Sequence, residues 1–214
     1  MRDARGSVQA LTAGQAAVVD VSAAIASADA ASVERESARA IDAGLPPAAL
    51  YETILQSYLF VGFPRAIEAF FAARPVLERA AGIPSAATPA DPSAWERVGE
   101  ALCRRVYGRN YEKLMETMRA LSPDLAVSML REGYGKTLSR PALGVVEREY
   151  GVIAILTVTR MWRQLRSHAI GAVNVGGTRA GVREAMERCR PWAGEETVRE
   201  ALSAAGMEED RARR

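Results

Sequence analysis

The sequence has few of the residues that mark redox, metal or phosphate chemistry. Cysteine occurs only at Cys103 and Cys189, far apart and without CxxC spacing, and His168 is the only histidine. These residues give no zinc-ligand spacing, and no glycine-rich loop follows a strand as a phosphate-binding loop would. We therefore predict no metal and no cofactor. Two distant cysteines suit a reducing compartment, so we expect a cytoplasmic protein whose thiols are small buried groups.

The sequence also lacks a strong net charge and a long apolar run. Its 28 Lys and Arg residues nearly balance its 26 Asp and Glu residues, and the two signs are interleaved. This excludes the basic surface of a nucleic-acid-binding protein, and the segment 166–186 lacks the basic recognition helix of a helix-turn-helix. Asp20 and Asp29 interrupt the most apolar N-terminal stretch, and no run reaches the length of a membrane span. We predict a soluble protein without nucleic-acid or membrane partners.

No segment alternates apolar and polar residues for long enough to predict a strand, whereas apolar residues recur widely at helical spacing. The sequence therefore predicts an all-α protein. Thr12 is the expected N-cap of the first helix, and Gly44 the expected end of the second. The helices are expected at about 12–28, 31–43, 46–62, 65–81, 95–107, 111–120, 122–135, 145–160, 162–175, 178–190 and 195–205. A segment rich in Pro, Ala, Ser and Thr at 82–92 is the expected linker.

An internal repeat emerges when the sequence is shifted by 132 residues without gaps. The matching positions are mostly apolar residues and helix-ending glycines, as a shared backbone would require. They include Leu11 with Leu143, Ala40 with Ala172, Gly44 with Gly176, Glu52 with Glu184, Gly62 with Gly194 and Glu68 with Glu200. We predict a first helical repeat at 11–81, connecting helices at 82–135 and a second repeat at 136–206, with the two copies packed with pseudo-twofold symmetry.

The two copies differ where chemistry is possible. Glu149 of the second copy corresponds to Ala17, and His168 corresponds to Glu36. A site that needs both an acid and a histidine is therefore expected in the second repeat alone, with the first repeat as its structural partner.

Four motifs carry a resemblance to a known family. They are YGKTLSRPAL at 134–143, QLRSHAIGAVNVGGTRAGVREAM at 164–186, AGLPPAALYETILQSYLFVGFPRAIEAF at 43–70 and VYGRNYEKLMETMRALSPDLA at 106–126. In this order and spacing, with the Glu of REYGVIAI between the first two, the chain resembles the carboxymuconolactone decarboxylase superfamily, which also contains thiol-dependent alkylhydroperoxidases. The resemblance covers most of the chain.

The chain departs from the peroxidase branch of this family at the redox motif. That branch carries CxxC ahead of the histidine, where this sequence has Met161 and Gln164. A thioether cannot become a thiolate and an amide has no redox chemistry, so the dithiol mechanism is unavailable. The resemblance that remains, in LRSH, is to the decarboxylase branch. It implies cofactor-free loss of CO₂ from 4-carboxymuconolactone, although Leu138 stands where that branch usually has tryptophan.

The family resemblance also carries expectations about assembly and the site. Decarboxylase members are typically hexamers of single-repeat chains, so a two-repeat chain is expected to form a homotrimer. The resemblance implies that His168 is the general acid and Glu149 its partner. The alternatives are a histidine at a helix–helix contact, and a buried glutamate paired with Arg148 or Arg140. A simple hairpin turning near Met161 would leave Glu149 and His168 two helical turns apart, unless the helices cross steeply or subunits share the site.

A carboxylated substrate needs a cationic partner, and arginine binds carboxylates through two parallel hydrogen bonds. Arg140, in the family's SRP motif, and Arg166 are the candidates to bind substrate, with Arg163 as a third. For each, a solvated surface position is the alternative. The leading hypothesis is a cofactor-free decarboxylase-like lyase acting on a small carboxylated lactone, and the second is a non-catalytic oligomeric binding or scaffold protein. A polar pocket at His168 would favour the first, and apolar packing the second.

Overall fold

The computed structural model describes residues 10–80 and 91–208, and within them every regular element is helical. The all-α prediction is confirmed. In chain order the elements are α1 (Ala13–Ser27), α2 (Ala30–Asp42), α3 (Pro47–Gln56), α4 (Tyr58–Ala80), η1 (Pro92–Ala94), α5 (Trp95–Tyr107), η2 (Gly108–Asn110), α6 (Tyr111–Leu121), α7 (Pro123–Ser128), η3 (Met129–Leu138), α8 (Val145–Val158), α9 (Trp162–Asn174), α10 (Arg179–Arg188) and α11 (Arg190–Ala205). None of these helices is both long and apolar enough to span a membrane.

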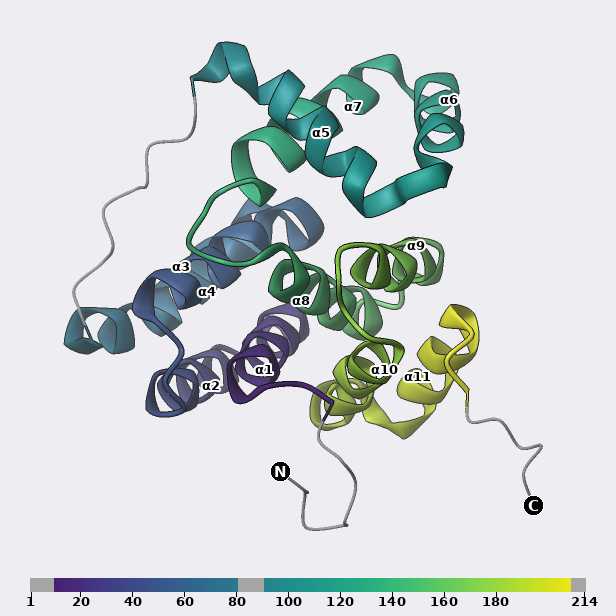
Figure 1. The fold of residues 1–214 in the computed structure, drawn as a ribbon. Coiled ribbons are helices and arrows are strands. Elements are labelled where there is room, and N and C mark those ends of the chain that lie inside the picture. Colours follow the sequence, from purple (N-terminus) through teal and green to yellow (C-terminus); the bar gives the residue numbers. More distant parts are fainter. Residues whose placement is uncertain (1–9, 81–90, 209–214) are drawn as a thin grey trace, which may run out of the picture.

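The helices form three groups around a central pair (Figure 1). Helices α1 to α4 enclose one apolar core, α8 to α11 enclose a second, and α5 to α7 with η3 enclose a third. Helices α1 and α8 lie side by side at the centre, and each buries ten of its residues, out of 15 in α1 and 14 in α8. Because Val18 packs into the first core and Val19 into the second, α1 joins the two groups.

Local sequence signals set the helix ends. Thr12 accepts a hydrogen bond from the backbone N–H of Gln15, whose side chain accepts one from the backbone of Thr12, so the predicted N-cap is confirmed as a capping box. Gly44, just beyond α2, has a φ of 86°, the left-handed conformation predicted there. The expected break between α5 and α6 falls at Gly108.

Two elements differ from the expected helices. The helix expected over 46–62 is divided at Ser57, so its last residues form the start of α4. Its expected end at Gly62 does fall on non-helical backbone within α4, two residues before Pro64. The helix expected over 122–135 continues to Leu138 as a π-helical segment, η3. The wider π-helical turn is a tertiary feature that helical periodicity does not report. The expected linker lies almost wholly in 81–90, outside the described residues.

The element bounds recur at the predicted offset of 132 residues. Helices α1, α2, α3 and α4 begin 132 residues before α8, α9, α10 and α11 respectively. Unusual backbone conformations recur with them: Ala28 and Arg160 have φ of 62° and 58°, and Gly62 and Gly194 both have φ of 79°. The packing of α1 to α4 against α8 to α11 about a pseudo-twofold axis stays a prediction.

Glycines allow the connecting segments α5 and η3 to pack closely against each other. A Cβ at Gly99 of α5 would collide with the carbonyl of Leu130, and one at Gly135 of η3 would collide with the carbonyl of Trp95. The two segments therefore approach more closely than helices with side chains at these positions could. This contact holds α5 in place above α9, where it forms one wall of the candidate site.

Candidate functional site

Glu149 of α8 and His168 of α9 form a buried pair. The distance between His168 Nδ1 and Glu149 Oε2 is 2.9 Å, and the two residues are 7% and 2% exposed. A carboxylate at this position accepts the Nδ1–H, which fixes the imidazole tautomer and leaves Nε2 facing the other way. No residue that the structure describes forms a hydrogen bond with Nε2.

Glu149 and His168 meet within one chain because α8 ends at Val158, before the turn that was expected near Met161. Helix α8 ends at Val158, nine residues after Glu149, and α9 begins at Trp162, six residues before His168. The offset along the antiparallel pair is therefore three residues, roughly 4.5 Å, and the two side chains span it. The expectation of a two-turn offset was wrong, because it counted the non-helical residues between the helices as part of the hairpin arms.

A glycine brings a third helix to the pair. A Cβ at Gly171 would lie 2.7 Å from Val106 Cγ1 and 3.2 Å from Glu149 Oε2. Gly171 therefore lets α9 lie close to both α5 and the glutamate. Asn174, one turn further along α9, donates from Nδ2 to the carbonyl oxygen of Val106 at 2.8 Å, so it ties α9 to the end of α5.

Aromatic rings enclose the imidazole. Phe60 and Tyr107 present their rings edge-on to His168, with centroid distances of 5.9 and 6.4 Å. Tyr134 of η3 lies edge-on to Tyr107 at 6.4 Å, and burial raises the pKa of both phenols, so both hydroxyls stay protonated at neutral pH. The sequence did not identify Phe60 and Tyr107 as site residues, because the family motifs place neither of them beside the histidine.

Cys103 of α5 also lies in this cluster. It is fully buried, and burial followed by the negative charge of Glu149 raises the pKa of its thiol to about 12. The thiol therefore stays protonated and is a poor nucleophile. Burial likewise raises the pKa of Cys189, whose sulfur lies 3.3 Å from the carbonyl oxygen of Ala185. Neither cysteine is disulfide-bonded.

The buried arginines pair with a different glutamate. Arg140 Nε lies 2.8 Å from Glu52 Oε1, and Arg148 Nη2 lies 2.9 Å from Glu52 Oε2. Arg148 also donates to Gln56 and to the carbonyl of Arg140. The alternative in which Glu149 pairs with Arg148 or Arg140 is wrong, because Glu52, from the first repeat, takes both arginines and leaves Glu149 to His168.

The other predicted substrate-binding arginines lie at the surface. Arg166 and Arg163 are exposed on α9, whereas Arg140 is 8% exposed. Side chains two residues apart on a helix point about 200° away from each other, so Arg166 and His168 face different directions. The structure thus brings Glu149 and His168 together but joins neither Arg140 nor Arg166 to them.

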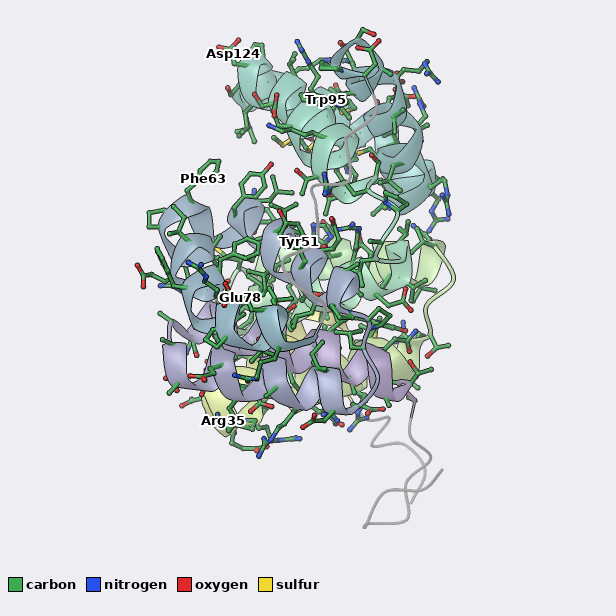
Figure 2. All side chains as sticks on the ribbon, turned by 90° about the vertical axis from the view of Figure 1, so that its left-hand side faces the viewer. Arg35, Tyr51, Phe63, Glu78, Trp95 and Asp124 are labelled. Carbon is green, nitrogen blue, oxygen red and sulfur yellow. The ribbon has the colours of Figure 1, made fainter. Side chains whose placement is uncertain are left out.

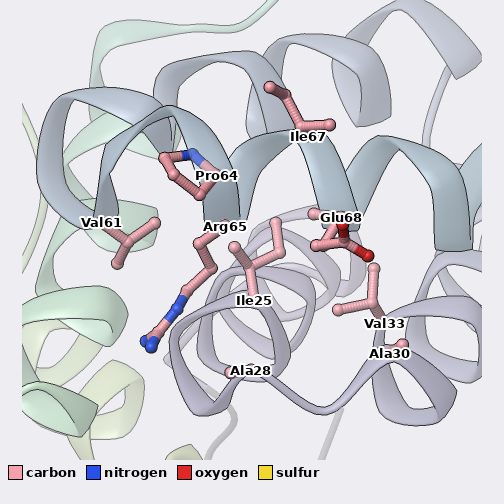
Figure 3. A pocket seen from close by; sticks show the side chains of 10 residues that line it. Ile25, Ala28, Ala30, Val33, Val61, Pro64, Arg65, Ile67 and Glu68 are labelled. Carbon is pink, nitrogen blue, oxygen red and sulfur yellow. The ribbon is translucent and has the colours of Figure 1, made fainter.

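The first repeat has a different arrangement at the equivalent place. Glu36, the counterpart of His168, pairs with Arg35 and Arg39 on α2. Ala17, the counterpart of Glu149, lines a hollow of about 340 Å³ with Glu36 and Asp20. A larger hollow of about 600 Å³ lies between α1, α2 and α4 (Figure 3). His168 lines neither hollow, and the described residues contain no cluster of three or more His, Cys, Asp or Glu that could hold a metal ion.

Comparison with known proteins assigns the chain to no family. No model of a known protein family matches the chain. Among curated proteins, the chain is similar to Peroxisomal protein 2 of Schizosaccharomyces pombe, with 31% identity over 144 residues. The aligned region covers 64% of this chain and 64% of that protein. The name describes the yeast protein as peroxisomal and states no activity.

Proposed function

We propose that the chain is a cofactor-free lyase of the carboxymuconolactone decarboxylase type, acting on a small carboxylated lactone or a related acid. The observation that carries the proposal is the buried hydrogen bond between His168 Nδ1 and Glu149 Oε2. A carboxylate that orients a histidine through one ring nitrogen leaves the other nitrogen to exchange protons with a substrate.

The proposed reaction needs one proton and no redox partner. The substrate carboxylate leaves as CO₂, and the electron pair of the broken C–C bond passes into the conjugated lactone. Protonated His168 then delivers a proton from Nε2 to the carbon or to the dienolate oxygen, and Glu149 stabilises the imidazolium beforehand. Phe60 and Tyr107, edge-on to the ring, limit the access of water to the proton donor.

The carboxylate-binding step is proposed for Arg140 and Arg166. Arg166 is exposed and would bind a ligand at the surface of α9. Arg140 would bind the substrate carboxylate while it stays paired with Glu52. If either binds the substrate carboxylate, its replacement by methionine raises KM more than it lowers kcat. Arg119→Met, at an exposed position of α6 with no proposed role at the site, is the control.

The first experiment measures CO₂ release from 4-carboxymuconolactone. We expect turnover by the wild type, loss of turnover in His168→Ala, and a fall of about 10²-fold or more in Glu149→Gln, as for other positioned acids and their partners. Cys103→Ala is expected to keep its activity because the proposed reaction uses no thiol. Turnover that survives in a folded His168→Ala variant would exclude the proposed proton donor.

A specific observation favours a second candidate, a non-catalytic oligomeric member of the same superfamily with a binding or scaffold role. His168 is 7% exposed, two aromatic rings lie edge-on to it, and it lines neither of the two hollows. Absence of CO₂ release from 4-carboxymuconolactone and related acids, by a protein that is folded and homogeneous, would favour this candidate.

Assembly and location form part of the proposal. We propose a homotrimer, equivalent to six repeats, and a cytoplasmic location. The similar yeast protein is peroxisomal by its name, so the peroxisome is the alternative compartment. Fluorescence microscopy of the tagged full-length chain in its own cells distinguishes a diffuse signal from a punctate one.

A further inference from the structure

The 600 Å³ hollow is a groove between the α1–α2 connection and the first half of α4 (Figure 3). Its walls are mostly apolar, with side chains from Ile25, Val33, Val61, Pro64 and Ile67. The volume lies within the range of small-molecule sites. Two charged residues also line the groove, and Arg65 and Glu68 lie toward its opposite ends (Figure 3).

The second repeat shows why this groove is open. At the offset of 132 residues, Ala28 corresponds to Arg160 and Ala30 to Trp162. The comparison is secure at this place because Ala28 and Arg160 share the same left-handed backbone between equivalent helices. In the second repeat the indole of Trp162 packs against the core of α8 to α11, and Arg160 lies over it, 5.7 Å from the ring centroid. The two alanines of the first repeat leave that space unfilled.

The second repeat also shows what charge the groove accepts. Arg160 Nη2 donates to Glu200 Oε2 at 2.6 Å, and Glu200 is the counterpart of Glu68. In the first repeat, alanine replaces the cation while the glutamate is kept. Among the residues that the structure describes, none forms an ion pair with Glu68, which is exposed at the groove. The open groove therefore keeps the carboxylate but lacks the aromatic ring and the cation that pairs with it, and its only lining cation, Arg65, lies toward the other end. Its apolar wall belongs to the first repeat, since Ile25 and Ile67 correspond to Thr157 and Arg199.

We propose that this groove binds a small molecule with an aromatic ring and a cationic side chain, the ring lying on the apolar wall and the cation pairing with Glu68. The ligand takes the place that Trp162 and Arg160 fill in the second repeat. Arg65 donates to the carbonyl of Ala26 at 2.6 Å and adds positive charge at the far end, so the cation is directed to the Glu68 end. The site is separate from His168 and does not depend on the proposed lyase activity.

The probe is tryptamine, an indole with an ethylammonium chain, titrated into the full-length protein and followed by ¹H–¹⁵N correlation spectra. We expect saturable shifts confined to residues 25–33 and 61–69. Indole-3-propionate has the same ring and an anionic chain, and we expect it to bind about fivefold more weakly or worse, since an ion pair at a partly exposed site contributes up to about 1 kcal/mol. Equal affinities for the two probes would overturn the proposal.

Two variants test the contacts separately. Glu68→Gln is expected to weaken tryptamine binding about fivefold while leaving indole-3-propionate unchanged or tighter. Ala30→Trp places in the groove the ring that the second repeat has, and is expected to abolish binding of both probes. Glu78→Gln, on the same helix but paired with Arg74 outside the groove, is the matched control. Binding that survives in folded Ala30→Trp, or an absence of shifts in the wild type, would contradict the proposal; if Ala30→Trp does not fold, Glu68→Gln decides alone.

Discussion

Gly171 has no side chain at the point where three helices meet around the candidate site. A Cβ there would lie 2.7 Å from Val106 and 3.2 Å from Glu149. Forcing a methyl group into a packed interior costs about 1–3 kcal/mol. We expect Gly171→Ala to lower the free energy of unfolding by that amount and to disturb the pair of Glu149 with His168. Urea unfolding followed by circular dichroism measures the change.

Three further variants show whether the loss comes from this contact. Val106→Ala removes the nearer neighbour, so the Gly171→Ala/Val106→Ala double variant should lose less than the two single losses together. Gly133→Ala is the control, because a Cβ at Gly133 meets nothing within 4 Å. Additive losses in the double variant would show that Val106 is not the obstacle.

At the site, the sequence predicted the identity of the pair but not its surroundings. The family motifs supplied Glu149 and His168, and the geometry of one chain brings them together. Tyr107 and Cys103 lie on α5, which is distant in sequence from Glu149 and His168. Helix α5 reaches the pair through close glycine contacts, at Gly99 and at Gly171, that sequence spacing does not predict. The ligand-binding role that its motif suggested for Arg140 stays a prediction. The structure adds an ion pair with Glu52, 88 residues away, that no motif indicated.

Among the secondary-structure elements, helix ends were more predictable than helix continuity. Thr12 and Gly44 act through hydrogen bonds and backbone conformations set by neighbouring residues, so sequence alone identified them. The π-helical η3 was not predictable in this way, because its backbone depends on packing against α5 around Gly99 and Gly135.

Gly62 and Gly194 test the internal repeat. Both have φ of 79°, with ψ of 165° and 163°, a conformation open essentially to glycine alone. Each interrupts its helix four residues after the first helical residue. We expect Gly62→Ala and Gly194→Ala each to cost about 1–3 kcal/mol through backbone strain, because a Cβ at either position meets no close neighbour. Chemical denaturation of both variants measures the costs, and a large cost at one position with none at the other would argue against equivalent roles.

For the whole molecule, an exposed apolar stripe on α4 bears on assembly. Phe63, Ile67 and Phe71 are spaced four residues apart and are 66%, 49% and 64% exposed, and Phe63 projects outward from the ribbon (Figure 2). Large apolar side chains gathered on one helix face are typical of an interaction surface. We expect light scattering to give a mass three times 23.0 kDa for the wild type, and that of a monomer for Phe63→Glu/Phe71→Glu. Helical content should be unchanged, and a monomeric wild type would contradict the proposed trimer.

Buried acidic groups make the fold sensitive to alkaline pH. Burial raises the pKa of Cys103 to about 12, and raises that of Cys189, Tyr107 and Tyr134 in the same direction. Above pH 9 the unfolded chain releases thiol protons that the folded chain still holds. The free energy of unfolding therefore falls as pH rises, by about 1.4 kcal/mol per unit for each thiol.

This linkage predicts that unfolding at pH 10 requires about 3 kcal/mol less than at pH 8, mostly from the two thiols, since the tyrosines of the unfolded chain only begin to ionise at pH 10. Cys103→Ala/Cys189→Ala should be less stable at pH 8 because of the cavities it creates, yet lose little further stability at pH 10. Guanidinium unfolding of both proteins at the two pH values measures the difference. An equal loss in the variant would show that the alkaline sensitivity arises elsewhere, and that the thiols are more accessible to ionisation than their burial implies.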